Sequence, residues 1–138
     1  MDNIQPLIAL FSDQSRTSVH RVVNYVSKWA PVYEYLFSHK GSFSVAELFG
    51  INSTAYGTCQ ADDLHYVFNH HIVEYPSLGS QSDRTVRDYM VKMWTSFAKT
   101  SVPVSPGELP FVWDQYSSNK LEYLKITEEP GNNLFLII

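Results

Sequence analysis

The feature that most constrains the fold is the segment at residues 32–37, Val-Tyr-Glu-Tyr-Leu-Phe. β-Branched and aromatic residues dominate it, which predicts a β-strand. Side chains of a strand point alternately to its two faces, and here both faces are mostly apolar. A strand of this kind is covered on both sides, as in the sheet of an α/β protein. Glu34 is the one charged side chain in the segment, and it needs a partner or access to water.

The strongest helical pattern covers residues 82–99. Apolar side chains recur there at helical spacing and form one broad stripe, which consists of Val86, Tyr89, Met90, Met93, Trp94, Phe97 and Ala98. Ser82 and Asp83 can cap the start of this helix, after a loop at 75–81. Three prolines within 100–110 then predict an extended connection.

Two further segments complete the pattern. Residues 12–29 predict a helix that Ser12 or Asp13 can cap, and its single face of valines requires another element to pack against. Residues 121–127 alternate like a half-buried strand, and Trp113 is expected to anchor the connection before it. Together with the first strand, these elements predict an α/β architecture.

Composition limits the class of protein. The 138 residues suit one domain, and 44% hydrophobic with 14% aromatic residues is typical of a globular chain. The ten basic residues are scattered, so no nucleic-acid surface is expected. No apolar run reaches the roughly 18 residues that span a bilayer, and the first residues lack the basic region of a signal peptide. The single cysteine excludes an internal disulfide.

Residues 56–69 read Tyr-Gly-Thr-Cys-Gln-Ala-Asp-Asp-Leu-His-Tyr-Val-Phe-Asn and predict a turn at Gly57, a polar elbow and a short helix over about 61–69. Asp62 and Asp63 are expected in its first turn, where the macrodipole favours negative charge. The stretch resembles the loop of the catalytic histidine in type-B carboxylesterases and cholinesterases. The pattern of that family is Gly-x-Cys-His-x-Asp-Asp/Glu-Leu-x-Tyr-x-Phe.

Other landmarks of the family follow in the same order, from residue 11 to about 127. Residues 31–38 resemble a late strand of its sheet, and residues 94–103 resemble its long late helix with a proline exit. Residues 59–64 look nearest to insect members, including enzymes like juvenile hormone esterase. The resemblance implies the C-terminal portion of an α/β-hydrolase fold, with late sheet strands and covering helices. Residues 1–138 would then be a partial domain, incomplete on its own.

Gln60 decides what the resemblance implies about activity, because it stands where the family has its catalytic histidine. A histidine takes the proton of the serine nucleophile and returns it to the leaving group, whereas an amide cannot act as a base. The family's nucleophile lies in a Gly-x-Ser-x-Gly segment, which does not occur in these residues, and the acidic partner belongs upstream. The resemblance implies a fragment of a carboxylic ester hydrolase, inactive as it stands. It uses no cofactor and meets an ester substrate only when an N-terminal part completes it.

Other candidate residues have simpler explanations. His65 lies about a turn and a half beyond Gln60, too far to replace the base. His70 and His71 point apart on a helix and match no zinc spacing with the nearby aspartates, so no metal site is predicted. Cys59 is expected to be a small buried residue and not a nucleophile. Structural hydrogen bonds are expected for the remaining histidines, His20 and His39.

Two alternatives stay open. The family has a non-catalytic branch in which loss of the triad accompanies adhesion or ligand binding, and Gln60 fits that branch. Asn52 begins an Asn-Ser-Thr sequon for N-glycosylation, which together with the family suggests a secreted or extracellular protein. The chain could instead be an unrelated small α/β domain, but two strands and two helices would leave an open sheet with apolar edges.

The strand aromatics Tyr33, Tyr35 and Phe37 are expected to pack in the core. In a complete enzyme they could instead line an apolar substrate cavity.

Overall fold

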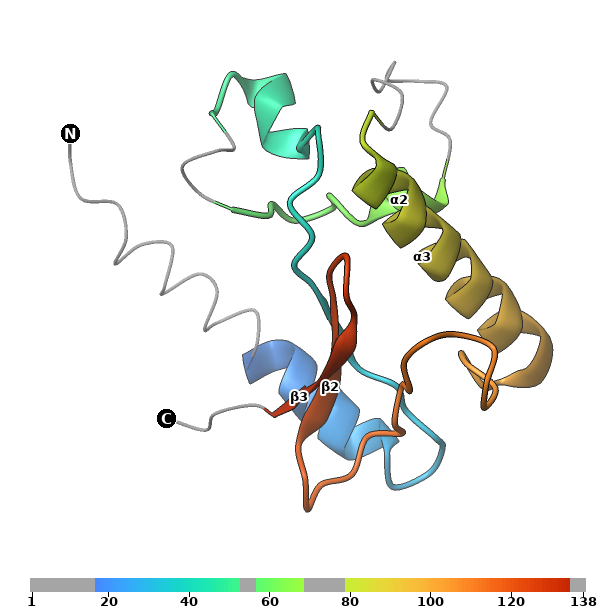
Figure 1. The fold of residues 1–138 in the computed structure, drawn as a ribbon. Coiled ribbons are helices and arrows are strands. Elements are labelled where there is room, and N and C mark those ends of the chain that lie inside the picture. Colours follow the sequence, from blue (N-terminus) through green and yellow to red (C-terminus); the bar gives the residue numbers. More distant parts are fainter. Residues whose placement is uncertain (1–16, 53–56, 69–78, 135–138) are drawn as a thin grey trace.

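The computed structural model describes residues 17–52, 57–68 and 79–134 (Figure 1). In chain order its elements are a helix over 17–26, strand β1 (Tyr35–Phe37), the 3₁₀-helix η1 (Val45–Phe49), helices α2 (Leu64–Val67) and α3 (Gln81–Thr100), and strands β2 (Glu122–Ile126) and β3 (Gly131–Leu134).

The three strands form one mixed sheet in the order β1-β2-β3. β1 and β2 are parallel, with Tyr35 opposite Leu124, and β2 and β3 are antiparallel. Parallel neighbours require a long crossover, which α3 and the segments around it supply. The predicted α/β architecture is confirmed, although the first strand is shorter than 32–37 and the second lies within 121–127.

Strand β3 is an element that the sequence pattern does not predict. Its residues, Gly-Asn-Asn-Leu, are mostly poor strand formers. Pairing with β2, in which Lys125 lies opposite Gly131 and Leu124 opposite Asn132, supplies the order that the local sequence lacks.

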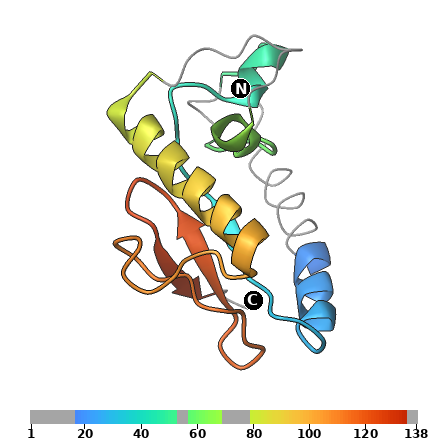
Figure 2. The same cartoon turned by 90° about the vertical axis from the view of Figure 1, so that its right-hand side faces the viewer.

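Helix α3 covers one face of the sheet (Figure 2). Its N-cap is Ser80, and the predicted cap Ser82 already lies inside the helix. Ser80 Oγ accepts the Asp83 N–H at 2.9 Å, and the Asp83 carboxylate accepts the Ser80 N–H at 3.2 Å. This reciprocal capping box satisfies two backbone groups that a helix end otherwise leaves unpaired, so Asp83 contributes from the third helical position.

The predicted stripe of α3 forms the core against β2. The fully buried residues of this contact are Val86, Met90, Met93, Leu124 and Ile126. The stripe leaves the core at the last turn of α3, where Phe97 is 46% exposed. Trp113 is buried, and its indole Nε1–H donates to the Glu34 backbone carbonyl at 3.0 Å. The connection after α3 is therefore anchored to the strand segment.

The helix over 17–26 and α3 are well separated in Figure 1. The first of the two ends three residues before the predicted end at 29, and the predicted caps Ser12 and Asp13 lie outside the described residues. Val23 is buried. The other valines of the predicted face are exposed: Val19 by 51%, Val22 by 61% and Val26 by 39%. Within the described part of the chain, this face is only partly covered.

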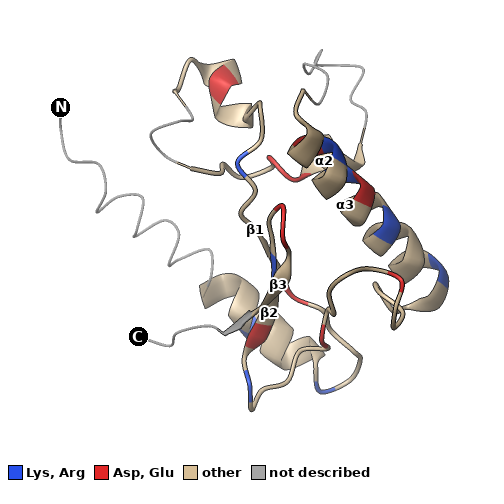
Figure 3. Cartoon of the chain, in the orientation of Figure 1, with Lys and Arg blue, Asp and Glu red and all other residues tan. Residues whose placement is uncertain are grey.

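Charged side chains are interspersed over the described residues, and both signs occur along α3 (Figure 3). Among the helices described, none combines the length and the apolar character needed to cross a bilayer.

Candidate functional site

The candidate site is the turn formed by residues 59–62, at the centre of the predicted histidine loop. The Asp62 N–H donates to the Cys59 carbonyl at 3.2 Å, and the Cys59 N–H donates to Asp62 Oδ2 at 2.7 Å. These two bonds close the turn from both ends. Ala61 adopts φ +73°, a left-handed conformation that favours glycine. Gln60, the other central residue, is exposed, so the turn presents the side chain at position 60 on the surface.

Asp62 also ties the turn to η1. Its carboxylate accepts the Ser44 hydroxyl at 3.0 Å on each oxygen and the Val45 N–H at 2.7 Å on Oδ1. Ser44 is the N-cap of η1. The prediction that Asp62 lies in the first turn of a helix over 61–69 is wrong, because α2 begins only at Leu64. Directed hydrogen bonds to a carboxylate are stronger than a macrodipole contact, and they fix Asp62 outside the helix.

Asp63 ties the same turn to the sheet. It also precedes α2, and its Oδ2 accepts the Tyr35 hydroxyl at 2.8 Å. Burial raises the pKa of Tyr35 well above its ordinary value, and the hydrogen bond and negative charge of Asp63 raise it further. Tyr35 therefore stays protonated and keeps donating at any ordinary pH, which holds β1 beside the turn.

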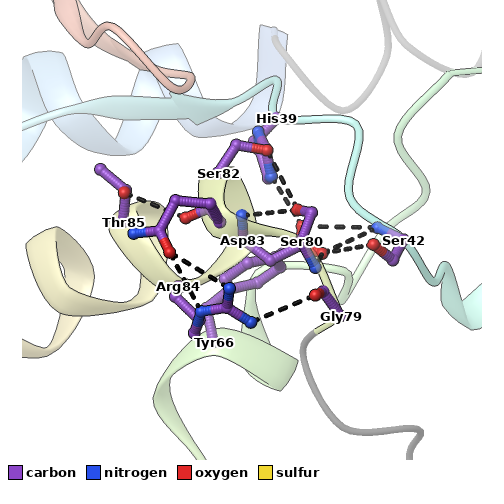
Figure 4. Close-up of polar contacts among 10 residues, drawn as sticks. His39, Ser42, Tyr66, Gly79, Ser80, Ser82, Asp83, Arg84 and Thr85 are labelled. Carbon is purple, nitrogen blue, oxygen red and sulfur yellow. Dashed lines mark hydrogen bonds and ion pairs between the residues drawn. The ribbon is translucent and has the colours of Figure 1, made fainter.

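Asp83 joins α3 to the two segments that flank the turn (Figure 4). Its carboxylate accepts His39 Nε2–H at 2.9 Å, the Ser42 hydroxyl at 2.6 Å and backbone N–H at 3.2 Å, and the Tyr66 hydroxyl at 3.0 Å. Asp83 itself is completely buried, and His39 and Tyr66 are 7% and 3% exposed. The predicted structural hydrogen bond of His39 is confirmed.

The charge of Asp83 is stabilised in this cluster. Burial alone would raise the pKa of its carboxyl, but the hydrogen bonds from Ser42, His39 and Ser80 outweigh that effect and hold the pKa well below its ordinary value. The cluster also requires a glycine beside it, because a Cβ at Gly41 would overlap the Tyr66 hydroxyl.

The remaining predicted residues have mixed outcomes. Cys59 is exposed, so the prediction of a small buried residue is wrong. The reason is that its backbone N–H, and not its side chain, makes the contact with Asp62. The His65 ring is half-buried against Phe43 and Tyr66, at centroid distances of 5.6 and 5.8 Å. Outside the described residues lie His70 and His71.

The two remaining residues named from the sequence are Asn52, which begins the sequon, and His20. Asn52 is exposed, although the rest of its sequon lies outside the described residues. The His20 ring lies edge-on to Tyr116 at a centroid distance of 6.2 Å.

An apolar pocket of about 190 Å³ lies between the strand aromatics and the C-terminal half of α3. It is lined by Tyr33, Tyr35, Met93, Trp94, Phe97, Pro103 and Trp113. Two of the three strand aromatics considered for a substrate cavity are among them, whereas Phe37 packs against Tyr66 at a centroid distance of 5.2 Å. Because Tyr35 also donates to Asp63, one wall of the pocket is connected to the turn.

Sequence reasoning missed Ser44 and Ser80, and it expected Asp83 only as a cap of the helix and not as the centre of a buried hydrogen-bond cluster. The Ser-x-x-Asp spacing of Ser80 and Asp83 is a capping-box pattern and could have been found. No local pattern marks Ser44 as a partner of Asp62, since 18 residues separate them. In the described part of the chain, no group of three or more histidine, cysteine or acidic residues is arranged to hold a metal ion.

Comparison with known proteins gives a consistent result. A model of the carboxylesterase family matches residues 2–135. Bile salt-activated lipase of Homo sapiens is 34% identical over 108 residues, which cover 78% of this chain and 13% of that protein. Esterase FE4 of Myzus persicae is 28% identical over 101 residues, covering 72% of this chain and 17% of that protein.

The fold agrees as well. The crystal structure of juvenile hormone esterase from Manduca sexta, with OTFP covalently attached, superposes with a TM-score of 0.63 and 28% identity, over 78% of this chain and 21% of that one. The chain thus spans less than a quarter of the relatives it matches, and the prediction of a partial α/β-hydrolase fold is confirmed. Because the relatives include a mammalian and an insect protein, the predicted nearness to insect esterases stays a prediction. With its family match extending over nearly all 138 residues, this chain belongs to the carboxylesterase family.

Proposed function

We propose that this chain forms the histidine-loop portion of a carboxylic ester hydrolase and that Gln60 leaves it without the base that hydrolysis needs. The observation that carries the proposal is the turn itself. It is closed from both ends by Cys59 and Asp62, and it presents one exposed side chain, at position 60. This geometry supports the proposal that the turn corresponds to the histidine loop of the family, with an amide at its tip.

The chemistry explains why this one residue matters. An imidazole has a pKa near about 6.5, so it can take and return a proton near neutral pH. A glutamine amide offers hydrogen bonds but no basic site in that range. Loss of one triad member lowers kcat by about 10⁴ to 10⁶ in serine hydrolases.

His65 does not offer an alternative base. Its ring is half-buried against Phe43 and Tyr66 in α2, which follows the turn, whereas Gln60 is exposed at the tip. A general base must lie within hydrogen-bond reach of the proton that it takes. The proposed substrates are carboxylic esters, and binding them would require the part of the fold that the 138 residues do not include.

The test is a chimera in which this chain replaces the matching part of human bile salt-activated lipase, whose own sequence supplies the rest of the domain. We expect no turnover of a p-nitrophenyl ester above background with Gln60, and a rise of at least about 10⁴-fold on Gln60→His. Gln60→Asn is the matched control and should stay inactive. Enzymatic turnover with Gln60 in place, in a folded chimera, would refute the proposed inactivity.

A second candidate is a non-catalytic carboxylesterase-like protein that binds a ligand or mediates adhesion. The observation that favours it is the exposed Asn52, which begins a glycosylation sequon and so suits an extracellular surface. Expression in a secretory host should then add a glycan that Asn52→Gln removes. A Gly-x-Ser-x-Gly segment in the preceding genomic sequence would favour an esterase ancestor, and its absence would favour the binding protein.

A further inference from the structure

We propose that Asp62 is a positioning residue, which sets where the side chain at position 60 stands by tying the turn to η1. The proposal rests on the proposed function only for the role of position 60. The contacts of Asp62 are the same whether that position serves catalysis or binding.

The inference depends on the Asp62 carboxylate accepting hydrogen bonds from two segments, the turn and the start of η1. Asp62 Oδ2 accepts the Cys59 N–H at 2.7 Å, and Oδ1 accepts the Val45 N–H at the same distance. The Ser44 hydroxyl lies 3.0 Å from both oxygens. One side chain therefore joins the residue directly before Gln60 to the start of η1, and a displacement of either segment is transmitted to the other.

Among the described residues, the turn is also held by the Asp62 N–H to Cys59 and Leu64 N–H to Ala61 backbone bonds, and by the Asp63–Tyr35 bond directly after it, but none of these joins it to η1. Cys59 and Gln60 are exposed, so apolar burial does not fix them, whereas Asp62 is only 6% exposed. Ala61 has φ +73°, a conformation that an alanine does not favour by itself. A strained backbone persists when its surroundings over-determine it, and the buried carboxylate is the group that does so here.

A competing explanation is that Asp62 only stabilises the fold by capping η1 together with Ser44. That role would lower the melting temperature when Asp62 is replaced, but it would not loosen the turn in the folded protein. The two explanations differ in the mobility of residue 59 well below the melting temperature. Cys59 is suited to measure this, because it is the single cysteine of the chain and is exposed.

The experiment attaches a nitroxide to Cys59 of the whole chain and compares the electron paramagnetic resonance line shape of the unsubstituted protein with Asp62→Asn. The backbone N–H that binds Asp62 stays intact in the label. We expect a more mobile label in Asp62→Asn. The Cys59 amide, in the unlabelled protein, should exchange its hydrogen about tenfold or more faster, as fits the loss of a hydrogen bond to a buried charge. Asp88→Asn, which removes the same charge from an exposed site on α3, should change neither measurement.

An Asp62→Asn line shape like that of the unsubstituted protein would overturn the proposal. If that variant does not fold, Ser44→Ala provides the test, because it keeps the carboxylate and removes its hydroxyl partner, together with the cap that Ser44 Oγ gives to the Ala46 N–H. An unchanged label in Ser44→Ala would then also overturn it. Either negative result would leave the proposed function standing, since that depends on the identity of residue 60 and is tested by the chimera.

Discussion

Asp83 and Glu34 are both buried carboxylates, 0% and 6% exposed, but their surroundings differ. The Asp83 oxygens accept bonds from the segment of His39 and Ser42, from Tyr66 on α2, and from Ser80 at the start of α3. Those from Ser42, His39 and Ser80 hold its pKa well below the ordinary value. Glu34 Oε2 has no hydrogen-bond partner among the described residues, and burial raises the pKa of Glu34 from 4.5 to about 6. One carboxylate is stabilised as an anion, while the other is destabilised.

The two carboxylates differ in whether the described residues around them supply hydrogen-bond donors. Around Asp83 the described chain supplies every donor that the carboxylate needs. Burial raises the pKa of Tyr116, and the negative charge of Glu34 raises it further. The Tyr116 hydroxyl itself donates to Asn24, on the helix over 17–26 whose valine face is partly uncovered. Among the described residues, the carboxylate oxygen without a hydrogen-bond partner thus lies in the same region as the partly covered valine face.

The largest effect is expected when the Asp83 cluster is broken. Asp83→Asn removes the charge and part of the acceptor capacity that His39 and Ser42 use, which should lower the free energy of unfolding by about 3 to 5 kcal/mol. Urea denaturation followed by circular dichroism measures this. Asp88→Asn, at an exposed position, should change it by less than about 0.5 kcal/mol.

A fallback is needed because Asp83→Asn could leave too little folded protein to measure. Ser42→Ala keeps the carboxylate and removes one of its donors, so a loss of about 1.5 to 3 kcal/mol is expected. If both substitutions lowered the free energy of unfolding as little as Asp88→Asn, the hydrogen bonds to Asp83 would not stabilise the fold.

A smaller effect of opposite sign is expected at Glu34. Because the pKa of Glu34 is higher in the folded state, the protonated carboxyl contributes to the free energy of unfolding. That contribution is present in full below pH 4.5 and is lost as the pH rises through about 6. The loss is at most about 2 kcal/mol. Glu34→Gln should therefore raise the free energy of unfolding at pH 7.5 and change it little at pH 4.5. Asp83 acts in the other direction, since its stability is present above its unfolded pKa of 3.8 and is lost as the pH falls through its lower folded pKa.

Urea denaturation of Glu34→Gln at the two pH values makes this measurement. Glu128→Gln, in the exposed turn after β2, is the control and should show no such pH dependence. Equal stability changes at pH 4.5 and pH 7.5 in Glu34→Gln would mean that Glu34 is solvated, and the contrast with Asp83 would fail.

The same contrast explains how much the sequence could predict. Periodicity located α3 and β2 well, because burial along a regular element repeats at a fixed spacing. The sequence also predicted that Glu34 needs a partner or water and that the valine helix needs an element to pack against. Among the described residues, Glu34 Oε2 has no hydrogen-bond partner and the valine face is only partly covered. A turn at Gly57 and a polar elbow over 57–60 were also predicted, and the structure has a turn over 59–62. These features depend on local sequence.

Features that depend on distant pairing could not be predicted. Asp62 and Asp63 were expected to favour a helix start, but Ser44 and Tyr35 bind them from 18 and 28 residues away. β3 forms because β2 pairs with it, not because of its own residues. Cys59 was expected inside, but the bond that orders it uses the backbone and leaves the thiol exposed.

The smallest expected effect concerns the turn over 59–62, where Ala61 has an unfavourable backbone conformation. Ala61 has φ +73°, which disfavours an alanine by about 1 to 2 kcal/mol, whereas a glycine adopts it freely. A glycine also loses more conformational entropy on folding, which offsets about 0.4 to 1 kcal/mol of this gain. Ala61→Gly should therefore raise the free energy of unfolding by about 0.5 to 1 kcal/mol, measured by urea denaturation. Ala98→Gly, the same substitution in the exposed last turn of α3, should instead lower it by up to about 1 kcal/mol. A loss of stability at both positions would mean that the turn is not strained, and Asp62 would then have no backbone strain to oppose.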